Sequence, residues 1–242
     1  MLETIAYDEG PQGQVALRRR TNDVGADVYE LIVNGTFVMD TVETSTERLL
    51  ASEALRRLHD DDLVVVVGGL GLGFTTRAVL SDERVRRVEV VELARVVVDW
   101  VRAGLVPETR GVLDDPRVRV HVADIRAFVS TLEDTSVDAV LLDVDNGPEF
   151  LVHTANQQVY ERPFLAACAR TLRCGGVLGV WSADRSGPLR ETLTNVFGAC
   201  EELSRTVRRE GRVWDYYLYL ATRMPEPVDG APRARCAGEV TT

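Results

Sequence analysis

The 242-residue chain is long enough for one large domain with a small appendage, and its 45% hydrophobic and 27% charged residues are those of an ordinary globular protein. No apolar run approaches the roughly 20 residues of a membrane span, and the N-terminus lacks a signal-peptide pattern, so we expect a cytoplasmic protein with no membrane partner. The net charge of −10 disfavours a nucleic-acid partner and favours a small-molecule ligand.

Residues 1–57 predict a small β-hairpin module with a linking helix. Its strands are Gln14–Arg20, Val28–Val33 and Thr36–Asp40. Asn34-Gly35 is the strongest short signal for a hairpin turn, because both residues tolerate a positive φ. A helix capped by Thr44 or Ser45 is expected to run to about Leu58.

Residues 58–223 predict the main domain, in which strands alternate with helices. The strands are Val64–Val67, Val85–Glu92, Val118–Val122, Val137–Leu142, Val177–Ser182, Cys200–Arg208 and Val213–Ala221. The helices are 74–81, Ala94–Ala103, Arg126–Leu132, Asn156–Leu172 and Leu189–Phe197. This alternation indicates right-handed crossovers and a mostly parallel sheet. Residues 224–242 are rich in proline, glycine and alanine and predict a disordered tail.

The cysteines are scattered along the chain. They are Cys168, Cys174, Cys200 and Cys236. Because no C-x-x-C pair and no cluster of histidines is present in the sequence, neither a disulfide framework nor a metal site is expected.

A glycine-rich turn follows the first strand of the main domain. Gly68, Gly69, Gly71 and Gly73 come directly after four valines, and a helix follows them. Glycine lets the backbone turn sharply and lie against a ligand. Strand, glycine turn and helix together are typical of a nucleotide-binding α/β unit.

Acidic residues end the next three strands. They are Glu92, Asp124, and the pair Asp143 and Asp145. In a parallel sheet, ligands bind beyond the carboxyl ends of the strands, and an acid about 20 residues past the glycine turn can accept both hydroxyls of a ribose. Glu92 has that spacing, and Asp124 is placed to accept the amine of an adenine. Each acid alone is equally consistent with a solvated strand end, but the set predicts an adenosine site.

The loop spacing and the strand order favour S-adenosylmethionine (SAM) over a dinucleotide. Gly68–Gly73 does not have the spacing best suited to a pyrophosphate, and the last strand follows the order of the class I methyltransferases. We therefore predict an α/β, Rossmann-like class I SAM methyltransferase fold. It has a seven-stranded, mostly parallel sheet, an antiparallel last strand and the small N-terminal β-hairpin module.

Over about residues 28–222 the sequence resembles the spermidine synthase family. The segments that carry the resemblance are Tyr29–Asp40, Gly68–Gly73, Val90–Leu93, Asp114–Val118, Asp124–Phe128, Leu142–Pro148, Tyr160–Phe164 and Leu172–Val177. The resemblance implies that the glycines bind the methionine portion of the cofactor. It implies Glu92 and Leu93 at the ribose, and Asp124 and Ile125 at the adenine. Asp143 would be the catalytic carboxylate beside the cofactor, and a homodimer is implied.

The sequence departs from the aminopropyltransferases of that family at three places. Those enzymes usually carry an Asp in the glycine loop that receives the amine of decarboxylated SAM, where this chain has Leu70 and Leu72. Their longer acidic segment is shortened to Asp143–Pro148, and Ala51-Ser52 replace a Tyr-His pair before Glu53. We therefore expect intact SAM as cofactor, no metal, and methyl transfer to a small amine- or hydroxyl-bearing metabolite.

Several alternatives stay open. Aminopropyl transfer of the spermidine synthase type and aminocarboxypropyl transfer remain, because the sequence does not show which sulfonium carbon faces the acceptor. A non-catalytic module that binds SAM or a nucleoside is an alternative of another class, and an NAD-linked dehydrogenase is a third. A nucleic-acid methyltransferase is disfavoured by the charge and by the lack of an Asn-Pro-Pro-aromatic motif.

The candidates for catalysis are Asp143, Asp145 and His153. Displacement at a sulfonium requires positioning of donor and acceptor and removal of a proton from the acceptor. One aspartate can orient the acceptor while the other takes its proton, and His153 can act as a base near neutral pH. In the competing interpretation, Asp145 caps the turn at Asn146-Gly147, His153 is structural and Asn156 caps a helix.

Overall fold

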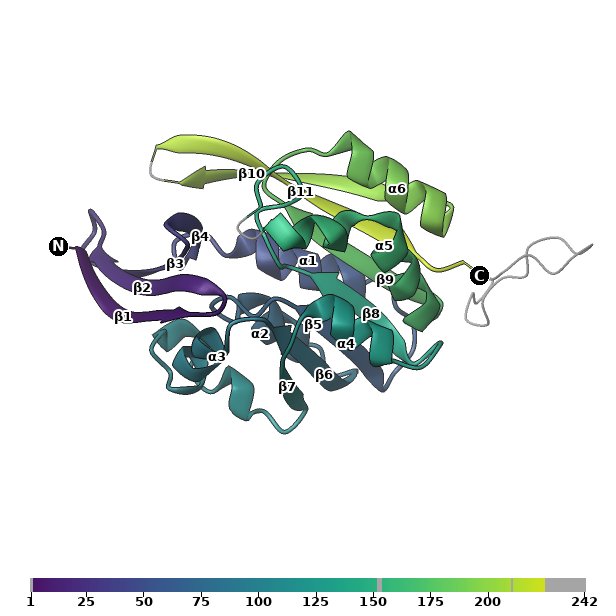
Figure 1. The fold of residues 1–242 in the computed structure, drawn as a ribbon, viewed down its shortest axis with the longest axis horizontal. Helices are drawn as coiled ribbons and strands as arrows, with labels where there is room; N and C mark the ends of the chain where they lie inside the picture. The colour runs from purple at the N-terminus through teal and green to yellow at the C-terminus, as the bar shows by residue number, and fades with distance from the viewer. Residues whose placement is uncertain (1, 152–153, 210, 225–242) are drawn as a thin grey trace, which may run out of the picture.

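The computed structural model describes residues 2–151, 154–209 and 211–224, which form a 4-stranded and a 7-stranded β-sheet (Figure 1). The small sheet is antiparallel, with the order β1-β2-β3-β4. Its strands are β1 (Leu2–Gly10), β2 (Gly13–Thr21), β3 (Asp27–Val33) and β4 (Thr36–Asp40). The predicted hairpin turn is confirmed, since Asn34 and Gly35 have φ of 51° and 76°. β1 was not predicted.

The large sheet has the order β10-β11-β9-β8-β5-β6-β7. Its strands are β5 (Leu63–Gly68), β6 (Val85–Glu92), β7 (Val118–Val122), β8 (Val137–Leu142), β9 (Leu172–Ser182), β10 (Glu201–Arg209) and β11 (Arg212–Thr222). Neighbouring strands from β7 to β9 are parallel, whereas β11 is antiparallel to both β9 and β10. The predicted α/β fold with an antiparallel last strand is therefore confirmed.

Helices cover both faces of the large sheet. They are α1 (Ser45–Leu55), α2 (Phe74–Leu80), α3 (Arg95–Arg102), α4 (Ile125–Thr131), α5 (Arg162–Thr171) and α6 (Gly187–Phe197). The valines of β5 alternate between two cores. Val65 and Val67 pack in the core that contains α1, α2 and α3, and Val64 and Val66 pack in the core that contains α4, α5 and α6. A strand buried on both faces needs apolar side chains at every position, which explains the four-valine run.

The helix predicted over 156–172 is instead a 3₁₀ turn followed by a shorter helix. The 3₁₀ turn spans Thr154–Tyr160, and α5 begins at Arg162. Pro163 lies in the first turn of α5, where a backbone N–H has no acceptor within the helix, so its absence costs no hydrogen bond. Inside one continuous helix, Pro163 would remove a hydrogen bond. β9 then begins at Leu172, earlier than the predicted Val177.

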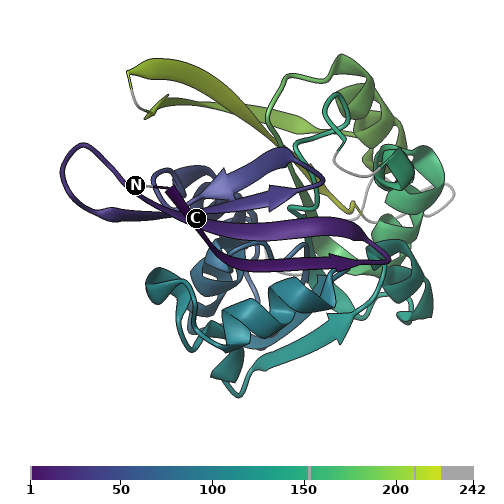
Figure 2. The same cartoon turned by 60° about the vertical axis from the view of Figure 1, so that its left-hand side comes forward.

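The small sheet and the C-terminal hairpin lie on the side of the large sheet from which the carboxyl ends of its parallel strands emerge. In both views the tip of the β10–β11 hairpin extends beyond the large sheet, toward β3 and β4 (Figures 1 and 2). An ion pair of 2.5 Å between Arg209 and Asp40 links the hairpin to β4. The strand ends that carry the predicted acids are therefore covered by other parts of the chain.

Two further findings concern the described residues only. No helix there is long and apolar enough to cross a membrane, and no group of three or more His, Cys, Asp or Glu side chains is arranged to hold a metal ion. Cys168 and Cys200 are free thiols. Cys174 is bonded in a disulfide, which its spacing did not predict.

Candidate active site

The glycine loop joins the ends of three strands. Gly69 donates its N–H to the carbonyl of Val91 at 2.9 Å, and Asp143 donates its N–H to the carbonyl of Gly68 at 2.8 Å. Gly69 has a φ of 90°, and a Cβ there would lie 2.0 Å from the carbonyl oxygen of Asp143. Only glycine fits this close approach, which sets the backbone of Asp143 beside the loop.

The two loop leucines do not face a ligand. Leu70 and Leu72 are 3% and 2% exposed and belong to the hydrophobic core. Gly71, between them, is the residue that lines the neighbouring cavity. The expectation that these leucines shape the cofactor site is therefore wrong. Gly69, Gly71 and Gly73 have φ of 90°, 50° and 92°, and between these turns both leucine side chains pack among apolar neighbours.

A cavity that we call the inner cavity lies between the strand ends and the small sheet. Its floor comes from the loop and from the residues that follow β6, β7 and β8, and its roof from β2, β3 and β4. The predicted site residues that line it are Gly69, Gly71, Glu92, Leu93, Asp124, Ile125, Asp143 and Asp145. Gly68 and Gly73 are not part of the lining: Gly68 packs against Ile125, and Gly73 precedes α2 with a φ of 92°.

Glu92 is held in place by the backbone. One carboxylate oxygen accepts the N–H of Leu70 at 2.9 Å and the other accepts the N–H of Ala94 at 2.8 Å. Burial raises the pKa of Glu92, and these hydrogen bonds oppose that effect. Each oxygen keeps lone pairs for a further donor, so the carboxylate is oriented to accept two ligand hydroxyls.

Asp124 and Ile125 begin α4 beside the same cavity. The Asp124 carboxylate accepts the N–H of Arg126 at 2.8 Å and pairs with its guanidinium at 2.5 Å, and both contacts keep its pKa below the ordinary value. The acid is thus a helix cap as well as a cavity residue. Ile125 is 7% exposed and presents an apolar side chain to the cavity.

Two carboxyls meet at the bottom of the cavity. The Thr75 hydroxyl donates to Asp143 at 2.6 Å, and the Thr46 hydroxyl donates to Glu47 at 2.8 Å. Burial and then the charge of Asp143 raise the pKa of Glu47, and burial raises the pKa of Asp143. Among the described residues, neither carboxyl has an ion pair with an arginine or histidine. Two buried acids without a cation form a site that favours a positively charged ligand.

Of the other two catalytic candidates, the structure describes Asp145. Asp145 is 6% exposed, and it accepts the side-chain N–H of Asn156 at 2.9 Å and the backbone N–H of Asn146 at 3.0 Å. The second contact matches the turn-capping interpretation, and the position of Asp145 in the cavity lining matches the catalytic one. Asn156 holds Asp145 instead of capping α5. His153 lies outside the described residues.

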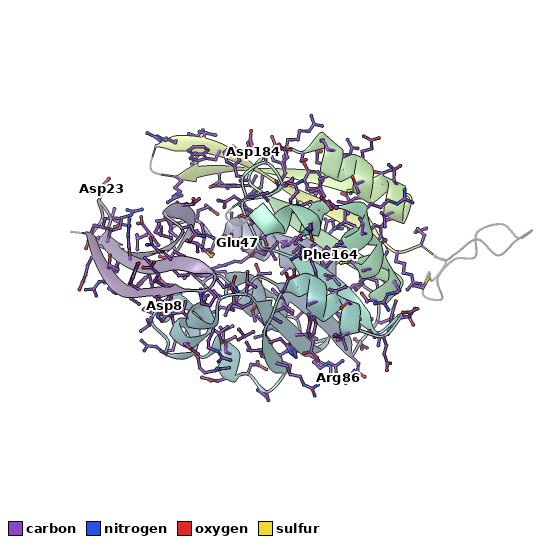
Figure 3. The ribbon with its side chains drawn as sticks, viewed as in Figure 1. Asp8, Asp23, Glu47, Arg86, Phe164 and Asp184 are labelled. Atoms are coloured by element: carbon purple, nitrogen blue, oxygen red, sulfur yellow. The ribbon has the colours of Figure 1, made fainter. Side chains whose placement is uncertain are left out.

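A second cavity, the outer cavity, opens beside the first. It lies between β4, the start of α1, the end of β9 and the β10–β11 hairpin, and its volume is about 390 Å³. Five residues line both cavities: Val38, Met39, Glu47, Asn146 and Trp181. The two cavities therefore meet at Glu47, which lies near the centre of the molecule (Figure 3).

The lining of the outer cavity is aromatic and acidic. The aromatic residues are Phe37, Phe150, Trp181, Trp214 and Tyr216, and the acidic ones are Asp40, Glu43, Glu47 and Asp184. Its one lining arginine, Arg209, pairs with Asp40 and lies over the Phe37 ring, 4.4 Å from the centroid. Aromatic faces and carboxylates both attract cations.

The sequence analysis missed Glu47 and named only Glu53 among the acids of this helix. Glu53 pairs with Arg56 and Arg57 at 2.5 and 2.7 Å and lines neither cavity. Glu47 lies six positions earlier on the same helix, and its side chain is 6% exposed. An acid in the first turn of a helix is common, so the sequence carries no signal that this one faces a cavity.

Comparisons with known proteins agree on one family. The spermine/spermidine synthase domain matches residues 43–199. Polyamine aminopropyltransferase 2 of Pseudomonas aeruginosa is 30% identical over 215 residues, which are 83% of this chain and 59% of that protein. Putrescine N-methyltransferase 4 of Nicotiana tabacum is 34% identical over 117 residues, which are 48% of this chain and 28% of that protein. The chain thus spans only part of either relative.

The fold is similar to that of a solved structure. The crystal structure of spermidine synthase from Thermotoga maritima matches with a TM-score of 0.75 and 19% sequence identity, covering 93% of this chain and 75% of that chain. At this identity the similarity concerns the fold alone.

These findings overturn the prediction of methyl transfer. The domain match and the relative with the longer match carry synthase or aminopropyltransferase names, and the methyltransferase match is confined to 48% of the chain. The prediction relied on Leu70 and Leu72, which face the core. It also relied on the loss of acidic groups, whereas Glu47 adds a carboxyl to the cavity.

Proposed function

The chain belongs to the spermine/spermidine synthase family, and on that premise we propose that it transfers an aminopropyl group from decarboxylated SAM to a small aliphatic amine. The observation that carries the proposal is a pair of buried acids that have no ion pair among the described residues: Glu47, where the two cavities meet, and Asp143, in the lining of the inner cavity. A donor with a sulfonium and an ammonium, and an acceptor amine, supply the missing positive charge.

The inner cavity suits the nucleoside part of the donor. In the proposal, Glu92 accepts the two ribose hydroxyls, because its oxygens are already oriented by Leu70 and Ala94. Asp124 accepts the adenine amine, and Ile125 and Leu93 contact the adenine ring. Gly69 and Gly71 bring only backbone against the ligand, which leaves room for the sulfonium.

The outer cavity suits the acceptor. An ammonium group is attracted by the carboxylates of Glu43 and Asp184 and by the faces of Trp181, Trp214 and Tyr216, while a methylene chain gains from contact with the same rings. Arg209 is neutralised by Asp40, so it does not cancel the attraction. A volume of about 390 Å³ admits a short diamine and excludes a macromolecule.

The proposed reaction is an in-line displacement. The acceptor nitrogen attacks the propyl carbon bonded to sulfur, the C–S bond breaks, and its electron pair stays on sulfur to give neutral methylthioadenosine. The nitrogen loses one proton, which Asp143 accepts and passes to water. Asp145 orients the acceptor amine from the opposite side of the turn. The protein contributes position and proton transfer, which are the main needs of such a step.

A donor comparison tests the proposal. Purified protein is incubated with putrescine and either decarboxylated SAM or SAM, and the products are separated by mass spectrometry. We expect spermidine and methylthioadenosine from decarboxylated SAM, at a kcat/KM at least about tenfold above any turnover of SAM. Methylated amine from SAM as the main product, or no turnover with a panel of amines, would contradict the proposal.

Thr75→Val is expected to lower kcat about tenfold at pH 7. The Thr75 hydroxyl is the hydrogen bond that lowers the pKa of Asp143 against the effect of burial. Without it Asp143 holds its proton to higher pH, and the acidic limb of the kcat profile moves upward. Thr76→Val is the matched control, because the buried Thr76 hydroxyl has no hydrogen-bond partner. Equal effects of the two variants, or an unmoved acidic limb, would show that Thr75 only fills space.

A further inference from the structure

Glu47 is a buried acid that has no ion pair among the described residues. It lies in the first turn of α1, is 6% exposed, and belongs to the lining of both cavities. Its one side-chain hydrogen bond comes from the Thr46 hydroxyl at 2.8 Å. Burying an acid with so little support destabilises a protein, so a gain elsewhere must account for it.

The glycine loop offers no side chain to a ligand at this point. A Cβ on Gly71 would lie 2.7 Å from the sulfur of Met39, and the same sulfur accepts the N–H of Leu72 at 3.2 Å. Met39 therefore fills the space that a side chain at position 71 needs. A carboxylate that faces the sulfonium end of the inner cavity has to come from another element.

The remaining acids of the inner cavity are engaged by protein groups. Glu92 accepts two backbone N–H groups, Asp124 pairs with Arg126, and Asp145 accepts the side chain of Asn156. Among the described residues, the side-chain contact of Glu47 and of Asp143 is with one threonine hydroxyl each, and neither pairs with a cation. Asp143 is assigned to the acceptor amine in the reaction above, which leaves Glu47 for the donor.

We propose that the Glu47 carboxylate binds the primary ammonium of the aminopropyl donor and so selects decarboxylated SAM over SAM. The proposal rests on aminopropyl transfer as the function. The ammonium is three carbons from the sulfur, and Glu47 lies where the inner cavity meets the outer one. A charged N–H···O⁻ contact in a buried site is strong. The extra carboxylate of SAM would lie close to the carboxyls of Glu47 and Asp143, and buried like charges repel each other.

Glu47→Gln tests the proposal through binding alone. Calorimetry gives the Kd of decarboxylated SAM, SAM and methylthioadenosine, the last of which has no aliphatic amine. We expect decarboxylated SAM to bind about 20-fold more weakly, and SAM to bind equally well or more tightly. Methylthioadenosine keeps the adenine amine but lacks the aliphatic amine, so its Kd should change less than twofold. Glu53→Gln is the matched control on the same helix, since Glu53 pairs with Arg56 and Arg57 outside the cavities. It should change none of the three values.

Equal weakening of decarboxylated SAM and methylthioadenosine would overturn the proposal, because a structural role affects both ligands. Unchanged affinity for decarboxylated SAM would overturn it as well. If Glu47→Gln does not fold, Glu47→Asp keeps the charge on a shorter side chain, and we expect a loss of about fivefold for decarboxylated SAM only. A wild-type protein that binds this donor through Glu47 but transfers no aminopropyl group would refute the proposed function and leave this proposal standing.

Discussion

Asp143→Asn is expected to lower the turnover of decarboxylated SAM with a diamine about 1000-fold, whereas the affinity for methylthioadenosine changes less than about threefold. The amide keeps the size of the side chain but neither takes a proton from the acceptor nor balances the positive charge at the cavity junction. The backbone of Asp143 stays in place, because its N–H is bonded to the carbonyl of Gly68 at 2.8 Å. Steady-state kinetics and calorimetry measure the two quantities.

Asp138→Asn provides the control for this prediction. Asp138 is a buried acid of β8, the strand that precedes Asp143, where it accepts the N–H of Val64 at 2.7 Å and pairs with Arg173 at 2.6 Å. Its substitution is expected to lower the melting temperature and to leave turnover per folded molecule nearly unchanged. A loss below tenfold for Asp143→Asn would remove this residue from the chemical step.

The strands of the large sheet were predictable because each one carries a signal in its own local sequence. β6, β7 and β8 begin and end where the sequence placed them, since runs of valine and leucine are followed by an acid or a glycine. β1 lacks that signal. Its side chains are mostly polar, and Leu2 and Tyr7 are 58% and 55% exposed on an edge strand. Its pairing with β2, more than its composition, makes it a strand.

The site residues that lie at the ends of the parallel strands could be predicted from the sequence. Glu92, Asp124, Asp143 and Asp145 line the inner cavity, as the parallel sheet requires. Glu47 could not be found this way, because α1 precedes the large sheet and reaches the cavity through its tertiary packing on α2, β8 and β9. The same limit explains the error about the loop leucines, whose direction depends on the local φ angles of the glycines and not on their spacing.

The affinity for decarboxylated SAM is expected to rise about 50-fold between pH 6 and pH 8, because the pKa of Glu47 in the empty site is raised to about 8. The ligand ammonium stays charged over this range, so the change belongs to the protein. The charged and titratable groups that face Glu47 are Asp143 after β8, Glu43 ahead of α1 and Tyr216 from β11. Both acids favour the protonated form of Glu47 at low pH, and binding of the cation releases that proton.

The free energy of unfolding of the ligand-free protein is expected to fall as the pH rises, whereas the affinity rises. The pKa of Glu47 is higher in the folded chain than in the unfolded one, so the folded state holds a proton that the unfolded state releases, and stability falls as pH rises from about 4.5 to about 8. Glu47→Gln removes this dependence and should stabilise the empty protein above pH 8 by on the order of 2 kcal/mol. Thermal unfolding at several pH values, with calorimetry beside it, measures both trends. If Glu47 binds the ligand, a rise in pH over this interval lowers the stability of the ligand-free protein and raises its affinity for decarboxylated SAM. If Glu47 has a purely structural role, that affinity does not change with pH.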